Sequence, residues 1–304
     1  MGLFGKKEPC PICGGKLPML LATKIEGQPI CNDCAAKIDL PQELVNTLTL
    51  DGLREYLRFY EENCKLRDDF VLSEKVDFGI MDTKIVFDYD HKLFCMSKNL
   101  DKTIFQGSQL KGITIWEDNQ LLFEGSPEAL KWYESMVPGW AATMAPQIAQ
   151  FRMNKELVEA IDRIGDDDDD HHHSRYVDIP EPFDQFNVEL QLDHPYWKVI
   201  QCDMSGPVIS ASYPDVGDYM NDYARDRQTV SQLVYALAAV AFPHAKECSG
   251  DEAPAPAPAA APQPAPAAPA QDPIEQLKKY KQLMEDGVID ADEFAAKKKQ
   301  LLGL

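Results

Sequence analysis

Apolar positions at helical spacing mark two amphipathic segments of the chain. Leu50, Leu53, Leu57 and Tyr60 recur every three or four residues between charged positions, which predicts a helix over residues 47–68, within a linking segment at 46–69. A second and longer apolar stripe predicts a helix within residues 215–242; its members are Tyr219, Tyr223, Val230, Leu233, Leu237 and Ala241.

Between these two helices, pairs of strand-like runs surround short polar turns, a pattern that predicts β-hairpins. The runs are KIVFDYDHKLFCMSK (84–98), KGITIWEDNQLLFEG (111–125) and FNVELQLDHPYWKVIQCD (186–203), with turns expected at 89–91, 118–119 and 193–195. Hairpins place neighbouring runs side by side in an antiparallel sheet. We therefore expect an α+β domain over residues 70–245, closed by the second helix, with an insertion of mixed helical character at 126–182.

The pattern changes again after residue 245. Residues 246–271 are expected to be a disordered linker, because the Ala/Pro alternation of 251–271 cannot form a core and favours an extended spacer. Residues 272–304 predict a helical hairpin that is broken at Gly287; its apolar positions are Ile274, Leu277, Tyr280, Leu283, Met284, Phe294, Ala295, Leu301 and Leu302. A hairpin of about 30 residues buries little surface alone, so we expect it to pair with a second copy or with another protein.

Four cysteines near the N-terminus form two C-x-x-C pairs, Cys10 with Cys13 and Cys31 with Cys34. This spacing lets two tight turns present four thiolates to one tetrahedral zinc ion. Glycines follow the first pair and a predicted helix start follows the second, an order typical of a treble clef or zinc ribbon over residues 1–45. Because four thiolates fill the coordination shell, we expect structural rather than catalytic zinc. A redox dithiol and a disulfide framework fit less well, because no βαβ pattern accompanies the pairs and the other cysteines are scattered.

Composition narrows the classes of function. The 304-residue chain carries a formal net charge of −20, whereas binding to nucleic-acid phosphates needs a basic surface. The longest apolar run of helical character, residues 233–242, is far shorter than the roughly 20 residues that cross a bilayer, and the N-terminus lacks the features of a secretory signal. We expect a cytoplasmic protein for which nucleic acid is not the partner and membrane contact is at most indirect.

The run DDDDDHHHS (166–174) contains metal-ligating residue types, Asp166 to His173. Adjacent residues in one run do not easily converge on a single ion, so we expect a solvated acidic loop, with weak adventitious metal binding as the alternative. The sequence contains no nucleophile elbow, Gly-rich phosphate loop or HExxH helix. We therefore do not expect an enzyme.

The tail IEQLKKYKQLMEDGVIDADEFAAKKKQLLG resembles the bacterial short C-terminal domain (SHOCT) family. The matching positions are Leu277, Lys278, Leu283, Gly287, Ile289, Glu293, Phe294, Lys297, Lys298, Leu301 and Leu302. This resemblance implies a role in oligomerisation or docking. The N-terminus is similar to a bacterial zinc-ribbon family of unknown function, with Cys10, Cys13, Cys31 and Cys34 at its ligand positions. The middle region resembles a pleckstrin-homology-like (PH-like) fold, apart from the long insertion; its acidic hairpin turns do not match a lipid-binding basic cluster.

Together these features predict a non-enzymatic zinc-binding scaffold or adaptor that binds protein partners and self-associates through residues 272–304. Two alternatives remain. A metal-dependent enzyme would use the run from Asp166 to His173. A nucleic-acid-binding protein would use the zinc ribbon, whose basic positions are Lys6, Lys7, Lys16, Lys24 and Lys37.

Overall fold

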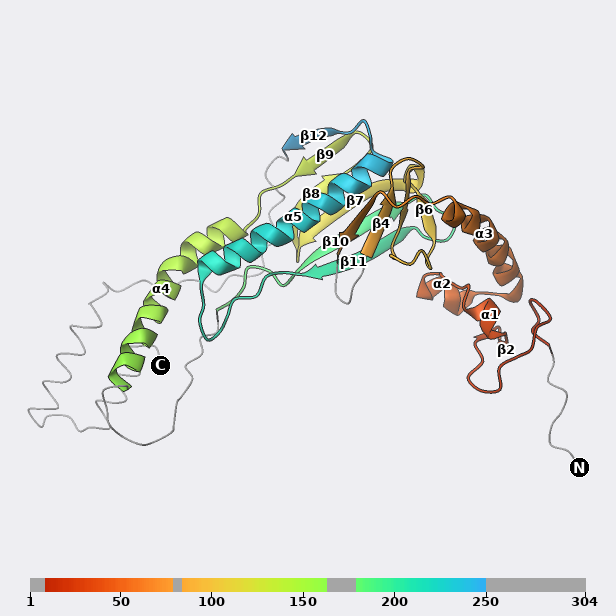
Figure 1. Cartoon of the computed structure of the whole chain (residues 1–304), viewed down its shortest axis with the longest axis horizontal. Coiled ribbons are helices and arrows are strands. Elements are labelled where there is room, and N and C mark those ends of the chain that lie inside the picture. Colours follow the sequence, from red (N-terminus) through yellow and green to blue (C-terminus); the bar gives the residue numbers. More distant parts are fainter. Residues whose placement is uncertain (1–8, 79–83, 163–178, 250–304) are drawn as a thin grey trace, which may run out of the picture. The chain divides into compact units, whose positions relative to one another are not determined.

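The computed structural model describes residues 9–78, 84–162 and 179–249 (Figure 1). The chain divides into two compact units, Met1–Pro256 and Ala257–Leu304. The predicted Ala/Pro-rich spacer, the helical hairpin at 272–304 and the run from Asp166 to His173 lie outside the described residues. Within those residues, no helix combines the length and the apolar character that a membrane span requires.

The N-terminal segment consists of short elements followed by one long helix. A hairpin of two short strands, β1 (Lys24–Ile25) and β2 (Gln28–Pro29), precedes α1 (Asn32–Ala35) and α2 (Gln42–Thr47). Helix α3 (Leu50–Asp68) is capped at its N-terminus by Thr49, whose hydroxyl accepts a hydrogen bond from Gly52 N–H at 3.0 Å. The helix predicted from the apolar spacing is thus confirmed.

Two sheets form the body of the first unit. The four-stranded sheet has the order β3-β4-β5-β6, with β3 (Glu74–Asp77), β4 (Lys84–Asp88), β5 (Leu93–Cys95) and β6 (Ile104–Gln106). A 3-10 turn, η1 (Gly107–Gln109), leads into the second sheet. That six-stranded sheet has the order β11-β10-β7-β8-β9-β12, with β7 (Leu110–Glu117), β8 (Gln120–Gly125), β9 (Ala129–Trp132), β10 (Gln185–Leu192), β11 (Val199–Ser205) and β12 (Lys246–Ser249).

All three predicted hairpins are present as antiparallel pairs: β4 with β5, β7 with β8, and β10 with β11. Asp118 in the second turn has φ +47°, a left-handed conformation that Asp tolerates better than most residues. The third loop, residues 193–198, is longer than the expected turn. The protein therefore has the predicted α+β architecture with a small cysteine-rich N-terminal domain.

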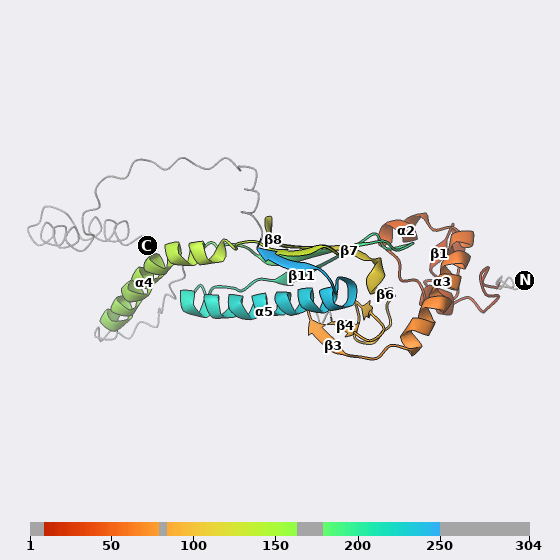
Figure 2. The same cartoon turned by 90° about the horizontal axis from the view of Figure 1, so that it is seen from above.

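The core lies between these sheets and α5 (Val216–Ala241), which packs against η1 and the four-stranded sheet (Figure 2). Asp215 caps its N-terminus by accepting hydrogen bonds from Gly217 N–H and Asp218 N–H. Near the other end, Gly107 lies so close to the helix that an added Cβ would be 2.3 Å from the carbonyl oxygen of Val240. Glycine is therefore required for this close approach.

Two predicted boundaries need correction. Residues 126–182 were expected to be an insertion of mixed helical character; they include α4 (Val137–Asp162), but β9 pairs with β8 as a strand of the six-stranded sheet. Residues 246–249 were assigned to the disordered linker, but they form β12, which pairs in parallel with β9. A four-residue edge strand is too short to show an alternating pattern, and its partner lies more than 100 residues away in the sequence. The PH-like resemblance stays a prediction.

Candidate functional site

The first cysteine pair lies in a tight turn. Gly14 N–H donates to the carbonyl of Cys10 at 2.9 Å, and Cys10 N–H donates to the carbonyl of Gly15 at 2.8 Å. Gly14 has φ +73°, which favours glycine at this position. Gly15 N–H then points at the sulfur of Cys13, 3.4 Å away. The turn therefore presents both thiols on one side together with a backbone donor.

The second pair opens a helix, as the sequence predicted. Cys31 is the N-cap of α1, and its Sγ accepts a hydrogen bond from Cys34 N–H at 3.4 Å. Cys31 N–H in turn donates to the Sγ of Cys10 at 3.4 Å, which links the two pairs. Turn, β-hairpin and helix thus follow one another in the order of a treble clef.

The four ligand atoms Sγ of Cys10, Cys13, Cys31 and Cys34 all lie within 4.8 Å of one another. Cys13 is exposed, and the other three are buried. No other cluster of three or more His, Cys, Asp or Glu ligand atoms occurs among residues 9–78, 84–162 and 179–249. The chemistry of four thiols with backbone N–H donors aimed at sulfur fits a metal ion that prefers soft ligands.

Electrostatics within the tetrad favour one thiolate and oppose more. Burial raises the pKa of Cys10, but hydrogen bonds from the N–H groups of Cys13, Cys31 and Ile12 outweigh it and lower the pKa to about 6. Burial and the neighbouring thiols of Cys13 and Cys31 raise the pKa of Cys34 well above its usual range. Four thiolates this close together need a cation to balance their charge.

A small apolar core supports the tetrad from beneath. Ile25 and Ile30 from the hairpin pack with Leu53 and Tyr56 from α3, and all four are at most 2% exposed. The hydroxyl of Tyr56 accepts a hydrogen bond from Asp39 N–H at 2.9 Å and lies 3.1 Å from the carbonyl oxygen of Lys37. The first two turns of α3 therefore belong to the fold of the cysteine domain.

The residues around this core are also hydrogen-bonded to the four-stranded sheet of the first unit. The carboxylate of Asp39 accepts hydrogen bonds from Thr103 N–H and Thr103 Oγ1, both at 2.7 Å, and pairs with Lys102 Nζ at 3.3 Å. Nearly two turns of α3 after Tyr56, Asn63 is 7% exposed and makes a two-point contact with Ile104. Its Nδ2 donates to the Ile104 carbonyl at 2.8 Å, and its Oδ1 accepts from Ile104 N–H at 2.9 Å. Asn63 thus acts as a strand partner for the edge strand β6.

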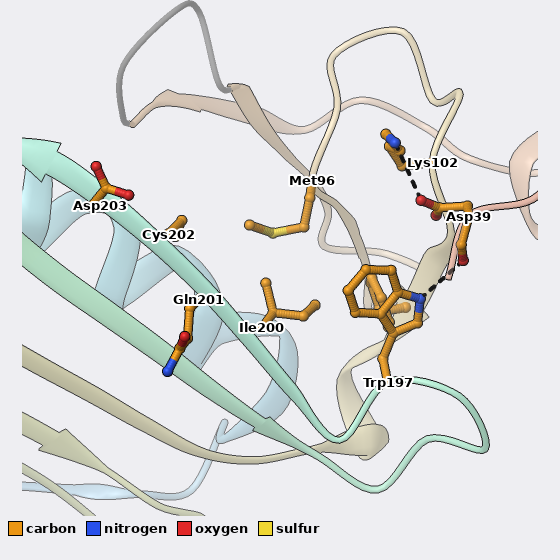
Figure 3. Close-up of a pocket in the computed structure, with 9 residues that line it drawn as sticks. Asp39, Met96, Lys102, Trp197, Ile200, Gln201, Cys202 and Asp203 are labelled. Carbon is orange, nitrogen blue, oxygen red and sulfur yellow. Dashed lines mark hydrogen bonds and ion pairs between the residues drawn. The ribbon is translucent and has the colours of Figure 1, made fainter. Parts of the chain in front are cut away.

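A cavity of about 360 Å³ lies at this junction. Figure 3 shows the side chains of Met96, Trp197 and Ile200 facing a common space, while Gln201 points to the other side of β11. The remaining lining residues are Asp39, Lys102, Phe105, Cys202 and Asp203. Trp197 is held by a hydrogen bond from its Nε1 to the carbonyl of Asp39 at 3.3 Å. Burial raises the pKa of the Cys202 thiol to about 12, so this thiol stays uncharged at neutral pH.

One wall of the cavity is the outer edge of β11, which no other strand covers in the described part of the chain. Leu192 N–H donates to the Lys198 carbonyl, and Gly206 N–H donates to the Asp184 carbonyl, each at 2.8 Å. Hydrogen-bonded pairs alternate along an antiparallel ladder, so they include Leu190 with Ile200 and Val188 with Cys202. The backbone N–H and C=O groups of Gln201 and Asp203 consequently point away from β10, toward open space.

A second cavity, of about 460 Å³, lies between α3, η1 and the end of α5, and His91 lines it. His91 Nδ1 is 2.7 Å from Asp88 Oδ2. This carboxylate is fully buried and also accepts hydrogen bonds from the N–H groups of Val71, Asp90 and His91. The pair is therefore explained as a cap on the β4–β5 turn.

The sequence alone indicates the four cysteines but not Asp39, Asn63 or Trp197. Asp39 and Thr103 are 64 positions apart, and no local pattern connects them. The apolar run that contains Val199 and Ile200 predicted a strand, but nothing in it showed which edge would remain open.

The comparisons with known proteins agree with the two ends of the chain. Residues 8–56 match a family model described as a domain of unknown function (DUF4428), and residues 275–302 match the short C-terminal domain (SHOCT). No match was found among curated proteins or among solved structures. The first match ends at Tyr56, the α3 residue that completes the core beneath the cysteines. The chain therefore combines a zinc-ribbon-like N-terminal domain of the DUF4428 type with a SHOCT segment near its C-terminus.

Proposed function

We propose that this protein is a non-enzymatic adaptor, stabilised by structural zinc, that binds an extended segment of a partner protein along β11. The observation that supports this most directly is the open edge of β11 beside an apolar cavity. We further propose that residues 272–304 supply a second contact, either with another copy of the chain or with another protein.

Zinc is the proposed metal because four cysteine thiolates form a closed tetrahedral shell for this ion. A closed shell has no position for substrate or water, so the metal would hold the small domain together. The core beneath it contains few large side chains, and domains of this size commonly depend on such a ligand. Thiolate ligands persist in a reducing compartment, so we place the protein in the cytoplasm.

An extended peptide suits the edge of β11 for two reasons. Its backbone can pair with the outward N–H and C=O groups of Gln201 and Asp203, which extends the sheet by one strand. One apolar side chain of the peptide can then enter the cavity between Met96, Trp197 and Ile200. Backbone pairing supplies affinity, and the cavity selects the side chain.

The C-terminal segment would increase the avidity of such an adaptor. Residues 250–271 link it to β12, and at about 3.1 Å per residue an extended spacer of this composition has a reach of tens of ångströms. Two chains joined through residues 272–304 would present two β11 edges to a partner with repeated motifs. Light scattering of the full chain and of residues 1–250 measures this association; equal monomer masses for both would remove it.

Replacement of Gln201 by proline tests the peptide site. Proline removes the outward N–H of residue 201 and leaves the ladder to β10 intact, since that N–H does not point at β10. Gln201→Ala is the matched control, because it keeps the backbone donor. Peptides selected from a displayed library against the full chain should bind the wild type and the Ala variant equally well. They should bind the Pro variant at least tenfold more weakly. Equal affinity for all three would contradict the proposal.

Metal content tests the zinc assignment separately. One zinc per chain should be found by elemental analysis of the purified protein, and Cys34→Ser should lose it together with the near-UV circular dichroism of the N-terminal domain. A metal-free protein with an unchanged spectrum would refute a structural metal.

A further inference from the structure

The loop between the first cysteine turn and β1 exposes three consecutive large apolar side chains. Met19 is 79% exposed, Leu20 83% and Leu21 101%. These are the three highest exposed fractions of large apolar side chains in the described part of the chain. Exposure of this kind usually marks a contact surface, because it costs solubility without adding to the core.

The loop is anchored at both ends. Leu17 is buried on one side, and Ile25 is buried on the other, each in the core beneath the cysteines. Leu21 has φ +52°, a left-handed conformation that a leucine rarely adopts. The backbone thus holds the Leu21 side chain outward at a cost in conformational energy.

The chemistry of the loop is uniform. Residues 17–22, LPMLLA, contain no charged or hydrogen-bonding side chain. Exposed lysines flank this stretch, Lys16 before it and Lys24 after it. These two lysines are the only charged residues between positions 16 and 25 of the sequence.

We propose that this loop inserts shallowly into the interface of an anionic lipid bilayer. The apolar tip would enter the boundary between headgroups and acyl chains, and Lys16 and Lys24 would remain at the level of the phosphates. Charge complementarity favours this occupant, because the two charged residues that flank the apolar tip, Lys16 and Lys24, are both cationic. A peripheral contact needs no membrane-spanning helix.

This inference goes beyond the adaptor function and does not depend on it. Insertion of one loop gives weak and reversible attachment, as a single short lipid anchor does. Any association of chains through residues 272–304 would multiply the loops on one surface and raise the avidity. Several loops together would then keep the protein at the membrane surface.

Sedimentation with vesicles tests the inference on the full, zinc-loaded chain. Vesicles of phosphatidylcholine alone and vesicles with one quarter phosphatidylserine are the two probes. Wild type should sediment with the anionic vesicles and far less with the neutral ones. The double variant Leu20→Ser/Leu21→Ser should bind at least about tenfold more weakly, while its melting temperature stays unchanged, because both side chains are already in water.

The matched control is Val71→Ser/Leu72→Ser, which changes two apolar side chains that are 52% and 61% exposed outside the cysteine domain. It should bind vesicles like wild type. Failure of wild type to bind anionic vesicles, or an equal loss in both double variants, would overturn the proposal. A loop variant that binds vesicles normally but shifts from a larger to a smaller mass in light scattering would also overturn it and identify a protein contact instead.

Discussion

Replacement of Asn63 by alanine should destabilise the protein far more than its position on a helix surface suggests. The change removes both hydrogen bonds between the Asn63 amide and the backbone of Ile104. Because Asn63 is 7% exposed, the N–H and C=O groups of Ile104 would lose their partners in a largely dry environment. Each unsatisfied buried group costs about 1–3 kcal/mol, and the better helix propensity of alanine returns about 0.5 kcal/mol. For the two groups together the expected net loss is about 1.5–5.5 kcal/mol.

Urea unfolding followed by tryptophan fluorescence measures this loss, since Trp197 lies at the same junction. With a slope of about 2–3 kcal/mol per molar urea, the midpoint should fall by about 0.5–3 M. Glu62→Ala is the matched control, because Glu62 is the neighbour of Asn63 on the helix and its side chain is exposed. This substitution should change the free energy of unfolding by less than about 0.5 kcal/mol. If Asn63→Ala behaves like this control, the amide does not act as a strand partner and the reasoning fails.

Three further changes probe other parts of the structure. Gly107→Ala should cost about 3 kcal/mol or more in thermal unfolding, because its Cβ would lie 2.3 Å from the backbone oxygen of Val240, which cannot move independently of α5; a loss below 1 kcal/mol would contradict the packing. Burial lowers the pKa of His194 to about 4, so the unfolded chain binds the proton first and stability should fall from pH 6.5 to pH 4; His194→Asn should flatten this part of the stability profile, and an unchanged profile would contradict the assignment. Tyr223→Phe removes a 2.6 Å hydrogen bond to the buried carboxylate of Glu117. It should lower the free energy of unfolding in urea by about 1–3 kcal/mol, and an unchanged stability would contradict the role of this hydrogen bond.

Local patterns in the sequence predicted the local features of the fold. The spacing of the four cysteines predicted the tetrad, because chelation by two tight turns depends on residues that are close in sequence. The spacing of Leu50, Leu53 and Leu57 predicted α3, and the Asp118–Asn119 turn predicted the β7–β8 hairpin. Each of these elements is encoded by residues that lie close together in the sequence.

Features that depend on distant partners were not predictable in this way. The parallel pairing of β12 with β9 joins residues more than 100 positions apart, and the hydrogen bonds of Asp39 with Thr103 span 64 positions. Hydrophobicity alone would have placed Leu20 and Leu21 in a core, whereas the structure exposes both. The cavity at the junction and the open edge of β11 follow from such long-range packing, so only the structure shows them.

Helix α3 also restricts how the length of this protein can vary among its relatives. Tyr56 completes the cysteine core and Asn63 holds β6, and seven residues, nearly two turns, place both on one face of the helix. Deletion of one residue between them would rotate one contact by about 100° relative to the other and shift it by about 1.5 Å. Insertions and deletions should therefore be absent between these positions in related chains. A gap-free stretch from Tyr56 to Asn63 would thus be expected in relatives that keep both contacts of this helix.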